Sequence, residues 1–139
     1  MAGAVYLADT SVYVLQGRHP QVRRRFESLL AAGRLAACQM TTLEYLNNAP
    51  DPKAYEILWG AMHGHRWIDV TAQAMDRALE VHRSLAATSQ HRQFRLPDLM
   101  IAATAELGGA VLLHYDADYD RIAAITKQQT EWVAPKGSL

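Results

Sequence analysis

Five carboxylates stand where predicted strands end or predicted helices begin. Asp9, Glu44, Asp98, Asp116 and Asp118 each follow or open an apolar run of the sequence. Carboxylates that converge on an apolar framework repel one another, and a buried carboxylate without a partner is costly. A divalent cation removes both problems, and four or five oxygen ligands suit Mg²⁺ or Mn²⁺. The pattern therefore predicts a hard-metal site that holds one or two ions.

Each acid also has an ordinary structural interpretation at a helix start, where an anion caps free N–H groups and suits the helix dipole. Glu44, for example, stands three residues after Thr41, which is the spacing of a capping box. Capping does not require the caps to gather at one edge of a sheet, whereas a metal site does. The joint pattern therefore favours metal binding. The hydroxyl of Ser11 fits two roles equally, as a partner of a carboxylate or metal-bound water and as a cap of the helix start.

Short apolar runs alternate with amphipathic segments along the whole chain. Strands are expected at 4–9, 34–40, 110–115 and 130–134, with an uncertain one within 63–71. Helices are expected at 10–17, 20–33, 41–48, 53–63, 71–87, 97–107 and from 116 onward. This alternation predicts an α/β fold, with a parallel sheet covered by helices on both faces. Ligands of such sheets bind at the carboxyl ends of the strands, where most of the five acids fall.

The composition fits one globular domain over residues 1–139, because half of the residues are hydrophobic. Acidic and basic residues balance at 14 each, so net charge gives no independent indication of nucleic-acid binding. Arg92 and Arg95 lie just before Asp98, where they fit two roles equally, as contacts to phosphates and as solvated charges of a loop. The lone Cys38 excludes an internal disulfide and is expected in the core. No apolar run approaches the ~20 residues that cross a bilayer, so a cytoplasmic protein without membrane contact is expected.

Other chemistries find less support in the sequence. No GxSxG motif surrounds Ser11, which argues against a serine nucleophile. His63 and His65 lack a third ligand at a spacing that suits zinc. The indole side chains of Trp59, Trp67 and Trp132 are expected to pack in the core.

Four segments together carry a resemblance to a known family. They are ADTSV (8–12), TTLEYL (41–46), LPDLMIAATAELGG (96–109) and LLHYDADYDRIA (112–123). In order and spacing the chain resembles the PIN-domain ribonucleases, and among them the VapC-type toxins of bacterial type II toxin–antitoxin systems. The resemblance implies a three-layer α/β/α fold with many helices and a short, mainly parallel sheet of about four or five strands. It also implies a VapB-type antitoxin as partner, a homodimer, and a bacterial cytoplasmic location.

The resemblance further implies a role for each acid. Asp9, Asp98 and Asp116 match the metal ligands, while Glu44 and Asp118 match acids that bind directly or through water and orient the attacking water. Ser11 matches the hydroxyl that supports the first acid. The implied reaction is hydrolysis of an RNA phosphodiester with Mg²⁺ or Mn²⁺. Two alternatives remain open, namely a non-catalytic Mg²⁺-binding module that acts through protein contacts, and a DNase of the flap-endonuclease type.

Overall fold

The central element of the chain is a five-stranded parallel sheet, seen in a computed structural model that describes residues 3–139. Across the sheet the strands are β3 (Arg66–Trp67), β2 (Leu35–Ala37), β1 (Tyr6–Ala8), β4 (Val111–His114) and β5 (Thr130–Trp132). Every neighbouring pair runs parallel. The prediction of a short parallel sheet is confirmed, including the strand within 63–71 that the sequence left uncertain.

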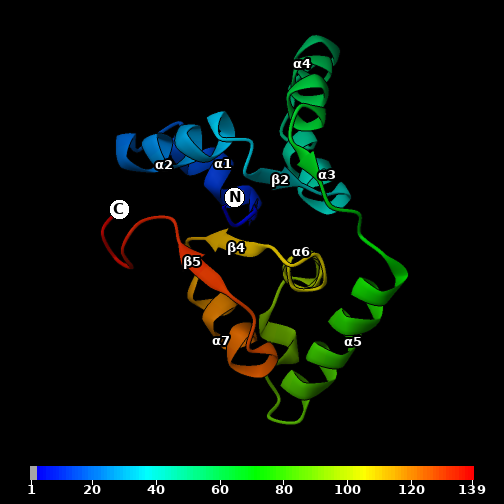
Figure 1. Cartoon of the computed structure of the whole chain (residues 1–139). Helices are drawn as coiled ribbons and strands as arrows, with labels where there is room; N and C mark the ends of the chain where they lie inside the picture. The colour runs from blue at the N-terminus through cyan, green and yellow to red at the C-terminus, as the bar shows by residue number, and fades with distance from the viewer. Residues whose placement is uncertain (1–2) are drawn as a thin grey trace.

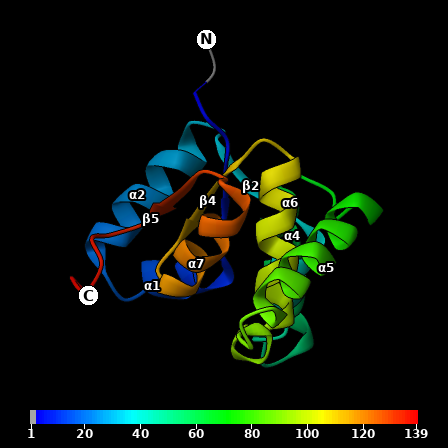
Figure 2. The same ribbon diagram turned by 90° about the horizontal axis from the view of Figure 1, so that it is seen from below.

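Helices connect the strands and cover the sheet. They are α1 (Thr10–Gln16), α2 (Pro20–Ala31), α3 (Gln39–Leu46), α4 (Pro52–His63), α5 (Ala72–Ala86), α6 (Leu96–Leu107) and α7 (Ala117–Thr126), with a 3₁₀ turn η1 (His91–Gln93). Figure 1 shows α1 and α2 on one side of the sheet and α5 and α7 on the other, with α4 extending away from the sheet. Figure 2 shows α6 beside α5. The three-layer α/β/α architecture is confirmed.

Alternation along the strands divides the core into two layers. Leu7 and Leu112 face a cluster with α5, α6 and α7, whereas Tyr6 and Leu113 face a cluster with α1 and α2. Successive strand residues point to opposite faces, so a strand buried on both faces must be apolar at every position. The three residues of β1 and the four of β4 are all buried. This two-sided burial fixes where β1 and β4 end.

The chain order makes the carboxyl ends of β1 and β4 the expected ligand site. From β1 the chain proceeds outward through β2 to β3, and it then returns to the other side of β1 to form β4 and β5. The strand order therefore reverses between β1 and β4. In open α/β sheets, ligands bind in the crevice outside the carboxyl ends at such a switch point.

Two local predictions are wrong. Helix α3 begins at Gln39 rather than at Thr41, because the Thr41 hydroxyl accepts a hydrogen bond from the Cys38 backbone N–H at 3.1 Å and helps to form the cap itself. Trp59 and Trp67 are 46% and 36% exposed and so lie outside the core. Their rings instead stack on either side of His63, with centroids 4.5 and 5.1 Å from it, and this stack ties α4 to the edge strand β3.

The buried side chains otherwise follow the sequence pattern. Cys38 is fully buried, as expected for a core residue. His114 on β4 is also fully buried, and burial lowers the pKa of its imidazole. Within residues 3–139, no helix combines the length and apolarity needed to cross a membrane.

Candidate active site

Asp9 stands at the carboxyl end of β1 and caps helix α1. The Ser11 hydroxyl donates to Asp9 Oδ2 at 2.6 Å, and the Ser11 backbone N–H reaches the same oxygen at 3.3 Å. The other oxygen, Oδ1, accepts from the Tyr119 hydroxyl at 2.8 Å. Asp9 is thus both a helix cap and a buried carboxylate held in one orientation by three donors. Ser11 therefore does both things that the sequence allowed: it supports the Asp9 carboxylate and it takes part in the cap of α1.

Glu44 reaches the same crevice from α3. Because α3 begins at Gln39, Glu44 lies in the second turn of the helix, where no free N–H groups remain for it to cap. The Thr10 hydroxyl donates to Glu44 Oε1 at 2.9 Å. Only 15% of the Glu44 side chain is exposed. This carboxylate therefore points inward without a capping function.

Asp98 enters from the first turn of α6. Pro97 lies beside it in this first turn, and the buried Leu99 and Ile101 anchor the helix in the core. Asp98 is only 6% exposed. Burial, reinforced by the charge of Asp9, raises the pKa of Asp98 to about 6, although Arg95 and Tyr119 act in the opposite direction. A carboxyl group with such a pKa is poorly solvated as an anion and favours a bound cation.

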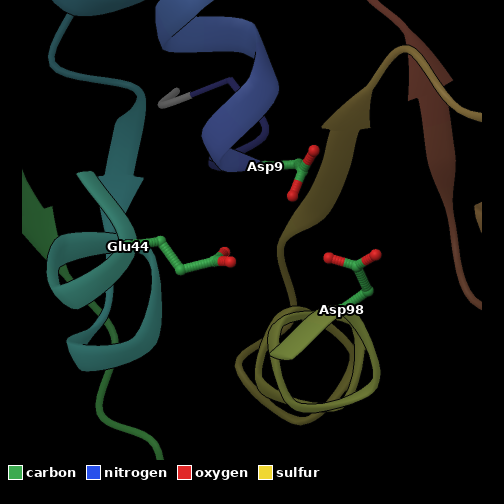
Figure 3. A group of neighbouring side chains, drawn as sticks. All are labelled: Asp9, Glu44 and Asp98. Carbon is green, nitrogen blue, oxygen red and sulfur yellow. The ribbon is translucent and has the colours of Figure 1, made fainter. Parts of the chain in front are cut away.

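These three acids form a single cluster, named here the carboxylate trio (Asp9, Glu44 and Asp98). One oxygen of each lies within 4.8 Å of the others. Figure 3 shows the three side chains pointing toward one another from separate parts of the chain. Oxygens that share one Mg²⁺ at about 2.1 Å are about 3–4 Å apart, so small side-chain rotations would bring the trio into coordination range. The oxygen-only donor set and its burial fit a hard divalent cation.

Asp116 and Asp118 follow β4 but lie outside the carboxylate trio. Asp116 is exposed and caps α7, where its Oδ1 accepts from the Asp118 backbone N–H at 2.8 Å. Asp118 lies 3.5 Å from an Arg121 guanidinium nitrogen. Burial, followed by the charge of Asp116, raises the pKa of Asp118. Both acids stand at the correct edge of the sheet, and their participation in metal binding stays a prediction.

The two arginines predicted as phosphate contacts differ in position. Arg92 is exposed in η1, whereas Arg95, at the N-cap of α6, donates to Glu44 and lies 3.7 Å from Asp98. Arg95 also lines an open pocket of about 320 Å³ together with two members of the trio. The other lining residues are Asp9, Thr10, Ser11, Val14, Glu44, Asn47 and Asn48. The pocket thus presents acidic, amide and guanidinium groups at one mouth.

Tyr119 belongs to the site although no sequence motif indicated it. Tyr119 is 1% exposed, donates to Asp9 and also faces Asp98. Burial and these two negative charges raise the pKa of its hydroxyl well above the ordinary value, so it remains a donor at neutral pH. The sequence did contain a sign that Tyr119 is buried, since Tyr119 and Ile122 are three residues apart and lie on the inward face of α7. Nothing local indicated that the hydroxyl would meet Asp9.

Replacing Tyr119 with Phe is expected to lower the activity of the site about tenfold while retaining the fold. The ring still fills its buried position, but Asp9 loses the donor that fixes Oδ1, and a hydrogen bond to a charged group contributes about 1.5–3 kcal/mol. Nuclease rates at saturating Mg²⁺ and urea unfolding measure both effects. Tyr115→Phe is the matched control, because its hydroxyl contacts Leu139 instead of a carboxylate. Equal losses in the two variants would contradict a positioning role for Tyr119.

Comparisons with known proteins agree on one family. The PIN domain profile matches residues 6–125. Ribonuclease VapC18 of Mycobacterium tuberculosis (strain ATCC 25618 / H37Rv) is 42% identical over 137 residues, which cover 97% of this chain and 99% of that protein. Ribonuclease VapC51 of the same strain is 45% identical over 134 residues, which cover 96% of each chain.

A comparison with solved structures identifies the same fold. A chain in the crystal structure of DNA-bound VapBC from Salmonella typhimurium superimposes with a TM-score of 0.73. The match covers 95% of this chain and 100% of that chain at 19% sequence identity. At this identity the likeness concerns the fold alone.

Proposed function

Because the chain belongs to the PIN-domain family and, within it, to the VapC ribonucleases, we propose that it is an endoribonuclease that acts as the toxin of a toxin–antitoxin pair. The observation that carries this proposal is the carboxylate trio. Its three oxygens come from the end of β1, from α3 and from α6 and lie within 4.8 Å of one another, and Asp9 and Glu44 also line an open pocket at the switch point of the sheet. Such a site binds a cation together with the phosphate of a long, exposed substrate.

The residues that would hold Mg²⁺ or Mn²⁺ are Asp9 and Asp98, joined by Asp116 from the end of β4. Glu44 and Asp118 would bind directly or through water, and the site would hold one or two ions. A bound divalent cation lowers the pKa of water, neutralises phosphoryl oxygens and stabilises the leaving oxygen. The chain supplies the oriented carboxylates for this chemistry, since Ser11, Thr10 and Tyr119 each fix one carboxylate oxygen.

The carboxylates also serve the proton transfer. Glu44 is the least buried member of the trio, and its Oε1 is held by Thr10. It is therefore placed to orient a water molecule for attack on the phosphorus and to accept a proton from it. Asn47 and Asn48 line the same pocket. Their amides, with Arg92 and Arg95, provide donors for phosphates on either side of the cleaved bond.

The proposed partner is a VapB-type antitoxin, since the similar solved structure is a VapBC assembly. An antitoxin segment that covers the pocket would silence the enzyme by excluding RNA from the trio. An antitoxin arginine directed at the carboxylates would also compete with the metal, because the guanidinium fork matches carboxylate geometry. A homodimer and a location in the bacterial cytoplasm, where the RNA targets are, complete the proposal.

Purified wild-type chain, incubated with total bacterial RNA, is expected to cut RNA with Mg²⁺ or Mn²⁺ present and to stop on addition of EDTA. Size-matched single-stranded and flap-containing DNA are the control substrates. Mapping of RNA 5′ ends after brief induction in cells then identifies the target. Preferential cutting of the flap DNA would instead favour the flap-endonuclease alternative.

Retained partner binding without any nuclease activity would favour the non-catalytic alternative. Co-expression of the VapB-type antitoxin proposed as the partner supplies the in-cell control. Growth is expected to stop without it and to resume with it. Growth arrest that persists with the RNA uncut would separate toxicity from ribonuclease action and contradict the proposal.

A further inference from the structure

A guanidinium already stands where the metal site needs a cation. Arg95 donates through Nη2 to Glu44 Oε2, and its Nη1 lies 3.7 Å from Asp98 Oδ1. These two acids come from α3 and α6, so Arg95 bridges two of the elements that a metal ion would join. The hydrogen bond to Glu44 and the charges of Asp98, Glu44 and Asp9 raise the pKa of Arg95, although burial alone would lower it.

The attachment of Arg95 leaves its side chain free to move. Arg95 is the N-cap residue of α6, in extended conformation, and 64% of its side chain is exposed. Glu44 and Asp98, by contrast, are held with 15% and 8% of their side chains exposed. When a divalent cation binds to the carboxylates, the acids can stay in place and the guanidinium can turn outward to the pocket mouth.

We propose that Arg95 is the internal counter-cation of the metal-free site and that it competes with the divalent metal for Glu44 and Asp98. The two cations compete because Arg95 already pairs with Glu44 and lies 3.7 Å from Asp98, the same two carboxylates that a metal bound by the trio would use. Metal binding therefore requires release of Arg95, and the released guanidinium remains at the mouth of the pocket, where an RNA phosphate would lie. This inference depends on the metal site of the proposed function.

Titration of the purified protein with Mn²⁺ tests the competition without RNA. By isothermal titration calorimetry, Arg95→Gln is expected to bind Mn²⁺ about fivefold more tightly than wild type, a modest factor because Arg95 is exposed. Arg95→Lys keeps a cation of different shape and should lie between the two. Arg92→Gln removes the same charge from the same loop and should change Mn²⁺ affinity less than twofold.

The wild-type chain provides an independent measurement. The Arg95 Nε–Hε signal in nitrogen-15 spectra, assigned by its loss in Arg95→Lys, should shift as Mg²⁺ saturates the protein. The corresponding signal of Arg77, which pairs at 2.8 Å with Glu106 at the opposite end of α6 from Asp98, should stay unchanged.

Four results would overturn the inference. Equal Mn²⁺ affinity of wild type and Arg95→Gln, or an equal gain in Arg92→Gln, would leave Arg95 as an ordinary surface ion pair. An unchanged Arg95 signal on Mg²⁺ saturation would show that metal and guanidinium do not exclude each other. Absence of Mn²⁺ binding in every variant would instead remove the metal site itself, and the competition with it.

Discussion

Asp98→Asn is expected to lower the rate of RNA cleavage at least about 100-fold, the usual loss when one fixed electrostatic group of an active site is removed. The asparagine amide has the shape of the carboxyl group, so the buried start of α6 keeps its packing. It lacks the negative charge, however, and the trio then attracts a divalent cation much less strongly. Initial rates on a defined RNA at saturating Mg²⁺ measure the effect, and growth after induction measures it in cells.

Asp76→Asn is the matched control for this variant. Asp76 is exposed on α5, away from the trio, and the chemical change is the same. Circular dichroism of both variants should match that of wild type. Cleavage by Asp98→Asn at the rate of Asp76→Asn would contradict a metal-binding role for Asp98. Asp9→Asn should behave as Asp98→Asn does, since Asp9 supplies another oxygen of the same cluster.

The sequence indicated the three acids of the carboxylate trio among five candidates, but it favoured Asp116 over Glu44 as a direct metal ligand. Asp9 follows a buried strand, and Asp98 follows a proline in the first turn of a strongly apolar helix. Parallel topology then places strand ends at one edge. The distances depend on how α3 and α6 pack, and side chains remote in sequence decide that packing.

The Asp116–Asp118 pair shows where local pattern stops being informative. Its sequence fits both a helix cap and a pair of metal ligands, and in the structure Asp116 caps α7. A helix cap can also belong to a carboxylate cluster, since Asp9 caps α1 and is a member of the trio. Sequence alone cannot give the side-chain rotation that separates the two cases, because that rotation responds to the local charge.

The fold could be predicted because local apolar patterns indicate its strands and helices. The errors of that prediction concern single residues. Apolar runs located the strands correctly. The start of α3 was misplaced because Thr41 is not the N-cap residue: it lies in the first turn of the helix, and its hydroxyl accepts a hydrogen bond from the backbone N–H of Cys38. The exposed Trp59 and Trp67 were misassigned because hydrophobic size usually indicates burial. Arg95 and Tyr119 act through contacts across 51 and 110 residues, which no local pattern contains.

Without metal, the ionised Asp98 is expected to destabilise the native state near neutral pH. Its pKa is about 6 in the folded chain and close to 3.9 when unfolded, so the folded chain binds more protons between these values. The free energy of unfolding therefore falls as pH rises. The stability contributed by protonated Asp98 is complete below pH about 4 and is lost as pH passes about 6. The difference in pKa corresponds to about 2–3 kcal/mol.

Asp98→Asn lacks this titration and isolates its effect. In EDTA, the variant should unfold at the same urea concentration as wild type at pH 4, and should be about 2 kcal/mol more stable at pH 7.5. The contributions of the other titrating groups cancel in the difference between the two free energies of unfolding, because both proteins contain these groups. Urea curves of the two proteins that stay parallel from pH 4 to 7.5 would show that Asp98 has an ordinary pKa. Adding Mg²⁺ at pH 7.5 should reverse the order, because only wild type keeps the complete trio whose binding of the ion stabilises the folded chain.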